Sequence, residues 1–293
     1  MSVIAPRQTT PRGTEPPVIV RQPGPQERHP RRSRRRRRVV ELTLAIGIPV
    51  ALVGLYQLAT SQRWIDPRLY PTLGEMGRNT RDLWNNGQLW DAIYISCKRA
   101  LIGFGFGALS GALVGFVMGA SRLLRAALEP TLSMLYTVPK LALLPVFLTI
   151  FGFGERAIYV LIAVTVFFFV WISTMAAVMA VPVGYREAAS TFGASRWQMF
   201  RHVLLPGALP QIFVGLRIAA SVSILVLVGV EFVIGSSGLG YLINQGRNLL
   251  LLGQAYVCIV IVAVIGYLFM ALVRLIGRVL TPWAPEDNAM ARQ

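Results

Sequence analysis

Side chains that could do chemistry are scarce in this sequence of 293 residues. The histidines and cysteines number two each and are His29, His202, Cys97 and Cys258. Their spacing would neither hold a metal ion nor build a catalytic triad or a disulfide framework. The phosphate-binding pattern G-x-x-x-x-G-K-[ST] does not occur either. We therefore expect no enzyme activity, no metal and no cofactor in this chain.

A few charged side chains within long apolar stretches remain as candidates. Lys140 and Glu231 are the two that we take as candidate pathway or gate residues, because a charge in an apolar stretch is expensive and usually has a role. Lys140 follows Pro139, where freed carbonyl groups could use its donors, so a structural role competes with contact to a substrate. Glu231 lies near the end of its apolar stretch. An interfacial carboxylate that reaches water is therefore as good an interpretation of Glu231 as a functional role.

The composition places these residues in a membrane protein. Charged residues make up 14% of the chain and hydrophobic residues 54%, with a mean hydropathy of +0.56, whereas soluble domains carry about 25% charged residues. The net charge of +16 would suggest a nucleic-acid partner if it were spread over the chain. Residues 1–38 alone, however, hold 11 basic and 2 acidic residues. We expect an integral membrane protein with no nucleic-acid partner.

Apolar stretches long enough to cross a bilayer, roughly 20 residues each, recur along the chain. They are residues 42–60, 100–120, 127–151, 157–181, 211–235 and 255–273. The third stretch contains Pro139 and Pro145, which remove backbone donors, so we expect it to be broken or kinked. The predicted fold is all-α, a polytopic membrane protein with six transmembrane helices.

The two ends of the chain are predicted to be polar cytoplasmic tails. Residues 1–38 contain seven of the eighteen prolines and have no apolar periodicity, so we expect disorder there. The arginine run that closes this tail favours a cytoplasmic N-terminus beside anionic lipid headgroups. A twin-arginine export signal is a poorer interpretation because no cleavage site follows. Six spans in residues 39–283 return the tail 284–293 to the cytoplasm.

Residues 61–99, between the first two stretches, are predicted to contain an amphipathic helix that lies on the membrane surface and leads into the second span. The apolar residues of this helix are Leu83, Trp84, Leu89, Trp90 and Ile93.

Glycine recurs every four residues in the second apolar stretch. The five positions are Gly103, Gly107, Gly111, Gly115 and Gly119. On a helix they share one face, which lets another helix backbone approach closely. We predict a packing face there, with the partner helix left open.

The connection 182–205 is predicted to form two short helices around a sharp turn. Glu187 is expected near the start of the first helix, where the helix dipole favours an acid, and Gly193 supplies the turn. Ser195 and Gln198 match the capping-box pattern at the start of the second helix. The apolar face of the second helix consists of Met199, Phe200, Val203 and Leu204. Such a rigid element with little bulk at its tip suits insertion into a groove of a cytoplasmic partner.

Several residues of this connection stand at a recognisable spacing. They are Glu187, Ala188, Ala189, Gly193, Ala194, Phe200, Val203, Leu205 and Pro206. The pattern resembles the EAA signature of ABC importer permeases, in which this loop is the coupling helix that docks into the ATP-binding subunit. The resemblance therefore implies contact with the ATPase for Glu187, Ala188, Ala189, Gly193 and Ala194.

Two further pairs of segments limit the resemblance to one group of these permeases. They are 138–145 with 151–155, and 229–232 with 238–241. They are similar to segments of nitrate, taurine and aliphatic-sulfonate permeases, and the likeness spans about residues 80–283. It implies type I ABC importer architecture in a bacterial plasma membrane and transport of a small anion. The implied partners are an ATP-binding cassette subunit that holds ATP and Mg, an extracytoplasmic solute-binding protein, a second copy of the permease, and lipid.

Two alternatives stay open. The same ABC architecture could import a pyrimidine-type vitamin precursor, because substrate choice in such systems rests largely with the binding protein. A carrier that works without an ATPase is the other alternative. It would be expected to show clustered intramembrane charges or inverted repeats, and the sequence indicates neither.

Overall fold

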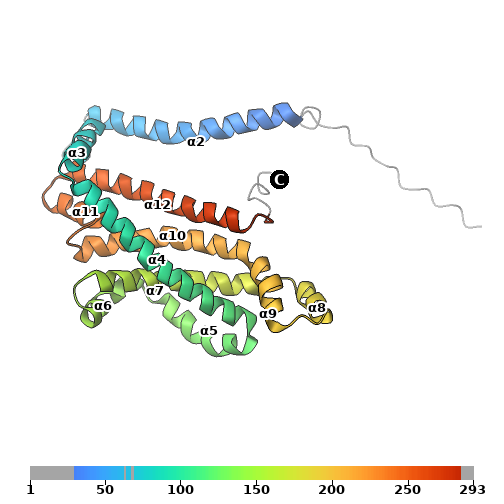
Figure 1. The fold of residues 1–293 in the computed structure, drawn as a ribbon. Coiled ribbons are helices and arrows are strands. Elements are labelled where there is room, and N and C mark those ends of the chain that lie inside the picture. The colour runs from blue at the N-terminus through green and yellow to red at the C-terminus, as the bar shows by residue number, and fades with distance from the viewer. Residues whose placement is uncertain (1–29, 63, 67–68, 285–293) are drawn as a thin grey trace, which may run out of the picture. The chain divides into compact units, whose positions relative to one another are not determined.

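The computed structural model describes residues 30–62, 64–66 and 69–284, and every regular element in these residues is a helix (Figure 1). Within the described residues, five helices are long and apolar enough to cross a membrane, and a bent helix pair makes a sixth crossing when it is counted as one span. The predicted all-α membrane fold is confirmed. The chain divides into two units, Met1–Ala59 and Thr60–Gln293, and each is described by itself.

The first unit is dominated by helix α2 (Pro30–Ser61), whose apolar part, Thr43–Ser61, is the first candidate span. The helix begins eight residues before residue 38, so the prediction of disorder is wrong for residues 30–38. Arginine is a good helix former, and proline is well tolerated in the first turn of a helix, so the arginine run extends the apolar helix instead of ending it. The predictions for residues 1–29 and 285–293 lie outside the described residues.

The second unit starts with α3 (Leu73–Asn85) and continues into α4 (Gln88–Ala120). The predicted surface helix is therefore split: Gly87 adopts φ +73°, a left-handed conformation that glycine favours. Leu83 and Leu89, on either side of the break, are buried, while Trp84 and Trp90 are exposed and pack edge to face with ring centroids 6.3 Å apart.

The third predicted span is broken, as its prolines predicted. Helix α5 (Arg122–Thr137) ends before an extended pair, Val138 and Pro139, and the chain resumes as the short 3-10 helix η1 (Lys140–Leu143) and α6 (Leu144–Phe151). The two halves are bent by 86°. Pro145 does not break a helix, because it lies in the first turn of α6, where its missing N–H group has no partner to lose.

Two of the three remaining spans are longer than their apolar stretches. The helices of this part are α7 (Glu155–Met179), α8 (Val183–Thr191), α9 (Arg196–Gln198), the π-helical turn η2 (Met199–Leu204), α10 (Leu205–Ile234), α11 (Leu239–Asn248) and α12 (Leu252–Leu280). Helices α9, η2 and α10 follow one another without a gap, so one continuous rod covers Arg196–Ile234.

Helix α7 lies at the centre of the second unit. In the most apolar 18-residue segment of α7, 56% of the residues are buried, against 17% in that of α12. Leu161, Ile162 and Val166 of α7 are fully enclosed in a core that also takes side chains from α4, α10 and α12. Figure 1 shows α8 and α9 at one end of this unit and α6 and α11 at the other. We call these the α8–α9 end and the α11 end.

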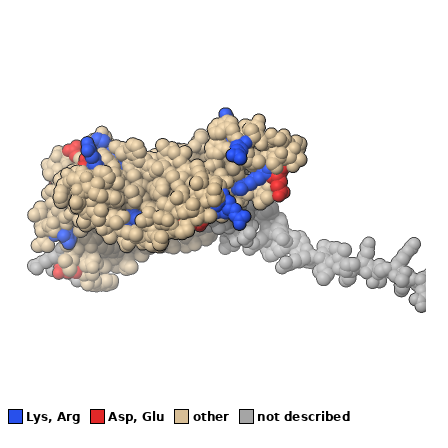
Figure 2. Space-filling model, turned by 90° about the horizontal axis from the view of Figure 1, so that it is seen from below, with Lys and Arg blue, Asp and Glu red and all other residues tan. Residues whose placement is uncertain are grey.

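The surface is consistent with a bilayer around the helices. Large apolar side chains such as Phe106, Leu109 and Leu113 of α4 are exposed, which in a water-soluble protein would form an unusually large apolar patch. Figure 2 shows charged side chains near the two ends of one face and a largely uncharged surface between them. This is the distribution expected of helices that cross hydrocarbon and end in water.

Candidate functional site

The α8–α9 end carries the loop that the sequence singled out. Helix α8 ends in a Schellman motif: the Gly193 N–H group donates to the Ser190 carbonyl and the Ala194 N–H group to the Ala189 carbonyl, both at 3.0 Å. Gly193 has φ +75°, and a Cβ atom there would meet nothing within 4 Å. Backbone conformation alone therefore requires glycine at this turn.

The second half of the loop is capped as predicted. The Ser195 side chain accepts from the Gln198 N–H group at 3.3 Å, and the Gln198 side chain accepts from the Ser195 N–H group at 2.8 Å. The prediction of a second separate helix is wrong, because this segment runs through the π-helical turn η2 into α10. The loop is thus one short helix, a tight turn and the beginning of the rod Arg196–Ile234.

The predicted ATPase-contact residues lie on the surface of this loop. Glu187, Ala188 and Gly193 are exposed, and Ala189 and Ala194 are half-buried. Glu187 is the fifth residue of α8, beyond the first turn, so the expectation that its charge interacts with the helix start is wrong. Next to them, Phe192 is 91% exposed, so the expectation of little side-chain bulk at the tip is wrong. A rigid turn with an exposed aromatic side chain at its tip is a typical contact for another protein.

The glycine row faces α7. All five glycines are buried, and a Cβ atom added at Gly107 would lie 2.8 Å from Val166 Cβ, while one added at Gly119 would lie 2.7 Å from Val178 Cβ. Gly103, Gly111 and Gly115 are equally close to side chains or backbone of α7. The row therefore brings the backbones of α4 and α7 together along most of their length.

At the α11 end the structure assembles a buried polar cluster that sequence reasoning did not find. Its centre is Arg99 of α4, which is 2% exposed. Its guanidinium binds Glu155 of α7 in a bidentate ion pair, and it donates to Glu231 Oε1 of α10 at 2.8 Å. The remaining N–H groups donate to the carbonyl and hydroxyl oxygens of Ser237, at 2.8 and 3.0 Å. All five guanidinium N–H groups thus have an acceptor.

Glu231 is fully buried, with 0% exposure, so the interpretation as a carboxylate that reaches water is wrong. Besides Arg99, it accepts from the Ser96 hydroxyl at 2.8 Å and from the Gly240 N–H group at 3.0 Å. The Ser96 oxygen in turn accepts from the Leu239 N–H group at 2.9 Å. Helix α11 has no side-chain cap of its own. Ser96 and Glu231 therefore satisfy its first N–H groups from α4 and α10.

Two glycines make room for this arrangement. Gly238 has φ +102°, and a Cβ atom there would overlap the Glu231 carboxylate. A Cβ atom at Gly240 would lie 2.6 Å from Glu231 Cβ. The Gly-Leu-Gly segment is thus required for α11 to start directly against Glu231.

The position of Arg99 and Glu155 explains why the cluster was missed. Arg99 immediately precedes the stretch 100–120, and Glu155 stands two residues before the stretch 157–181, so both resemble charges at the membrane surface. The expectation that intramembrane charges do not cluster is wrong in this structure. Charged residues at the ends of three spans were the available signal. Because every donor and acceptor is paired and the cluster caps a helix, its role in this conformation is to position elements.

Lys140 is held by the break in its span. Its ammonium group donates to the carbonyls of Leu135, Tyr136 and Val138, at 3.1, 2.5 and 2.8 Å, and lies 4.6 Å from the centre of the Phe168 ring. An ammonium group has three N–H groups, and all three are used here. The lysine satisfies the carbonyls that the break in the helix exposes, which favours its structural interpretation over contact with a substrate.

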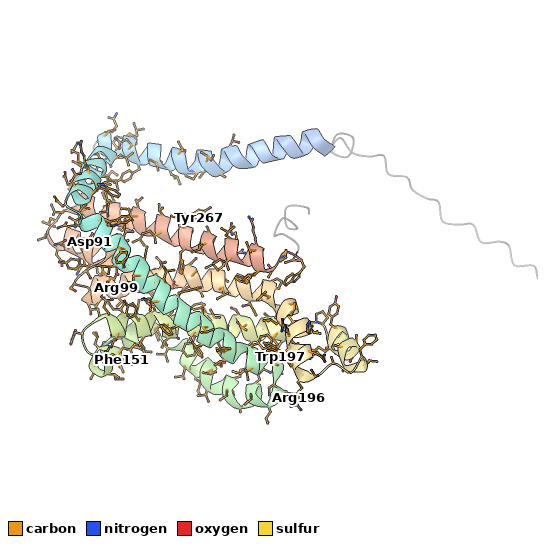
Figure 3. The ribbon with its side chains drawn as sticks, viewed as in Figure 1. Asp91, Arg99, Phe151, Arg196, Trp197 and Tyr267 are labelled. Atoms are coloured by element: carbon orange, nitrogen blue, oxygen red, sulfur yellow. The ribbon has the colours of Figure 1, made fainter. Side chains whose placement is uncertain are left out.

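The described residues contain no group of three or more His, Cys, Asp and Glu side chains that could hold a metal ion. Figure 3 shows Arg99 and Phe151 at the opposite end of the second unit from Arg196 and Trp197. The two candidate sites, the 182–205 loop and the Arg99 cluster, are therefore separated by the length of the membrane helices, and α10 joins them, with Glu231 near its far end.

Comparison with known proteins identifies the class. Residues 106–283 match the family described as binding-protein-dependent transport system inner membrane component. The chain belongs to this family, the membrane-embedded permease subunits of ABC importers. It is a multi-pass membrane protein and not an enzyme, since ATP hydrolysis in these systems lies in a separate subunit. Membership also implies an ATP-binding subunit and a solute-binding protein as partners.

Individual relatives refine this placement. The chain is 35% identical over 238 residues to the putative aliphatic sulfonates transport permease protein SsuC of Escherichia coli strain K12, covering 81% of this chain and 90% of the relative. It is 31% identical to the taurine transport system permease protein TauC of the same organism, covering 84% and 91%. The nitrate import permease protein NrtB of Leptolyngbya laminosa is 34% identical, covering 68% and 71%. The predicted resemblance is confirmed.

Among solved structures, an inward-facing form of the MetNI methionine ABC transporter has a chain that superimposes with a TM-score of 0.57 at 23% identity. The match covers 66% of this chain and 96% of that chain. At this identity the likeness establishes the fold, which is that of an ABC importer permease.

Proposed function

We propose that this chain forms the membrane path of an ATP-driven importer for a small anion such as a sulfonate, taurine or nitrate. The relatives that support this substrate class are permeases for aliphatic sulfonates, taurine and nitrate, and two of them match four-fifths or more of the chain. ATP and Mg are bound by the partner ATPase and not by this chain.

The observation that carries the proposal is the construction of the 182–205 loop. Glu187, Ala188, Ala189, Gly193 and Ala194 contact the ATP-binding subunit. A Schellman motif and a capping box hold this surface in one shape. Since the loop continues directly into α10, displacement of the loop by the ATPase moves a membrane span.

The working complex contains a second copy of the permease and surrounding lipid, and its N- and C-termini lie in the cytoplasm of a bacterial cell. Exposed apolar side chains along α4 support contact with lipid or with the second copy. Arg186, Arg196 and Arg201 gather at the α8–α9 end, which supports a cytoplasmic position for that end under the positive-inside rule. The Arg99 cluster then lies at the outer side.

Transport follows from two states of the complex. Binding of ATP closes the ATPase subunits and draws the two loops together, and the permease helices rock from an inward-open to an outward-open state. The docked solute-binding protein then releases its anion into the central path. The Arg99 cluster keeps α4, α7, α10 and α11 together at the outer end while the loop end moves.

Reconstitution in liposomes tests the proposal. The permease is co-purified with its ATP-binding subunit, and uptake of labelled taurine, an alkanesulfonate, nitrate and a pyrimidine vitamin precursor is measured with and without ATP and the solute-binding protein. Uptake of one of the three anions that requires both ATP and the binding protein is expected. Uptake without the ATPase would identify a carrier, and uptake of the pyrimidine alone would contradict the substrate class. A variant ATPase that cannot hydrolyse ATP is the matched control.

A further inference from the structure

The rod that leads from the loop into the membrane has a weak point near its start. Between α9 and α10, the turn η2 is π-helical, and the Leu205 N–H group donates to the Phe200 carbonyl, five residues back. A π-turn inside an α-helix is rare, and it is one of the features at which helices kink. If η2 yields when the loop is displaced, the displacement is lost before it reaches α10.

Three aromatic rings lie against this turn. The Trp197 ring stacks on the Phe200 ring with centroids 5.1 Å apart and planes 20° apart. The Phe200 ring meets the Phe116 ring of α4 edge to face, with centroids 4.7 Å apart and planes at 72°. Phe200 belongs to η2 itself, so its ring is held between the start of the rod and a different membrane helix.

The inner member of this stack is anchored in the core. Phe116 is buried in a cluster with Val178 near the end of α7 and Val181 just after it, and with Leu204 of η2 and Ala208 of α10. Trp197 at the other end of the stack is 64% exposed, two residues after the capping residue Ser195. The rings thus connect the exposed loop surface with the interior of the helix bundle.

α4 is not adjacent to the loop in the sequence, because the loop lies between α7 and α10. α4 is nevertheless locked to α7 by the glycine row. A ring from α4 that presses on Phe200 therefore supports η2 from a rigid neighbour. Aromatic rings have few side-chain conformations and pack in defined geometries, so such a contact resists bending of the turn.

We propose that Phe116, acting through Phe200 and Trp197, is a positioning residue for transport: it braces the π-turn so that displacement of the loop by the ATPase passes into the membrane helices. The inference rests on the proposed coupling function of the loop. Without the brace, the ATPase still binds and hydrolyses ATP, and the turn absorbs the movement.

Replacement of Phe116 by alanine tests this, with Phe104→Ala as the matched control. Phe104 lies on the same helix and makes the same kind of edge-to-face pair, but with Phe269 of α12, at 5.0 Å and 75°. Each variant is co-purified with the ATP-binding subunit, and uptake and ATP hydrolysis are measured in the same liposomes. In Phe116→Ala we expect normal recovery of the ATPase subunit and about two- to tenfold less uptake per ATP, the range that loss of one aromatic pair allows. Phe104→Ala is expected to keep the wild-type ratio.

An unchanged ratio in Phe116→Ala, or an equal fall in Phe104→Ala, would overturn the inference. If Phe116→Ala does not accumulate in the membrane, Phe116→Leu keeps most of the volume without the ring and is read against the same criterion. A wild-type permease that retains no ATPase subunit would contradict the proposed function itself. If the Phe116→Ala variant retains an active ATPase and has a normal ratio of uptake to ATP hydrolysis, only the proposed role of Phe116 is contradicted.

Discussion

Replacing Arg99 by methionine is expected to destabilise the protein strongly, because it leaves the Glu231 carboxylate buried without its ion-pair partner. Glu231 has 0% exposure, and breaking a buried pair from one side costs about 3–5 kcal/mol. Glu155→Gln removes the other ion pair of the same arginine, but the Glu155 side chain is 50% exposed. A loss of at most about 1 kcal/mol is therefore expected for that variant.

The double variant Arg99→Met/Glu231→Gln separates charge from capping. It removes both buried charges, and glutamine still offers an oxygen to the Gly240 N–H group, so most of the stability lost in Arg99→Met should return. The assay is thermal unfolding of the detergent-solubilised complex. At each temperature, size-exclusion chromatography measures the fraction of protein that stays monodisperse. The unfolding temperature of Arg99→Met should lie more than about 6 °C below that of the wild type. Equal effects of Arg99→Met and Glu155→Gln, or a double variant less stable than Arg99→Met, would refute this reasoning.

Three further substitutions each have a built-in comparison. Gly111→Val should lower stability by about 1–3 kcal/mol or prevent folding, since a Cβ atom there lies 2.6 Å from a backbone oxygen of α7, whereas Gly105→Val, with nothing within 4 Å, should be tolerated in the same unfolding assay. Gly193→Val should leave membrane insertion intact and lower the uptake per ATP hydrolysed, because valine resists a φ of +75°. Gly184→Val in the same loop, where a Cβ atom also meets nothing within 4 Å, should leave this ratio unchanged. Equal ratios of uptake to ATP hydrolysis in the two variants would contradict the role of the turn. Lys140→Met should lower the unfolding temperature, because it removes the ammonium donors from the carbonyls of Leu135, Tyr136 and Val138. Lys140→Arg should recover most of that loss, and equal unfolding temperatures in the two variants would show that the donors are unimportant.

Apolar length and helix-breaking residues were sufficient to predict most of the fold. The break at Pro139 agrees with local chemistry, because proline removes a backbone donor, but the loss of a donor alone does not decide it, since Pro130 of the same stretch lies inside α5. The turn at Gly193 and the capping box at Ser195 are likewise local features, and the structure contains both. Two spans were predicted to begin too late, because α4 and α7 start before their apolar stretches and include Arg99 and Glu155.

The Arg99 cluster could not be predicted in the same way, because it depends on which helices are neighbours. Arg99, Glu155 and Glu231 are separated by 56 to 132 residues in the sequence. Taken singly, each resembles a charge that reaches water at a membrane surface. Their burial is decided by tertiary packing of three spans and by the Gly-Leu-Gly segment that lets α11 begin against Glu231. The error for residues 30–38 has another cause: composition predicted disorder where helix propensity and the following apolar helix prevail.

Contact between the 182–205 loop and the ATP-binding subunit can be measured by site-directed photo-crosslinking. Cys97 and Cys258 are first replaced by alanine, a single cysteine is introduced by Phe192→Cys, and a thiol-specific photo-crosslinker is attached in the intact complex. Phe153→Cys is the control, since Phe153 is 89% exposed and lies in the loop between α6 and α7, at the other end of the second unit. We expect a crosslink to the ATP-binding subunit from position 192 and none from position 153. Crosslinks to that subunit from position 153, or none from position 192, would contradict the proposed contact.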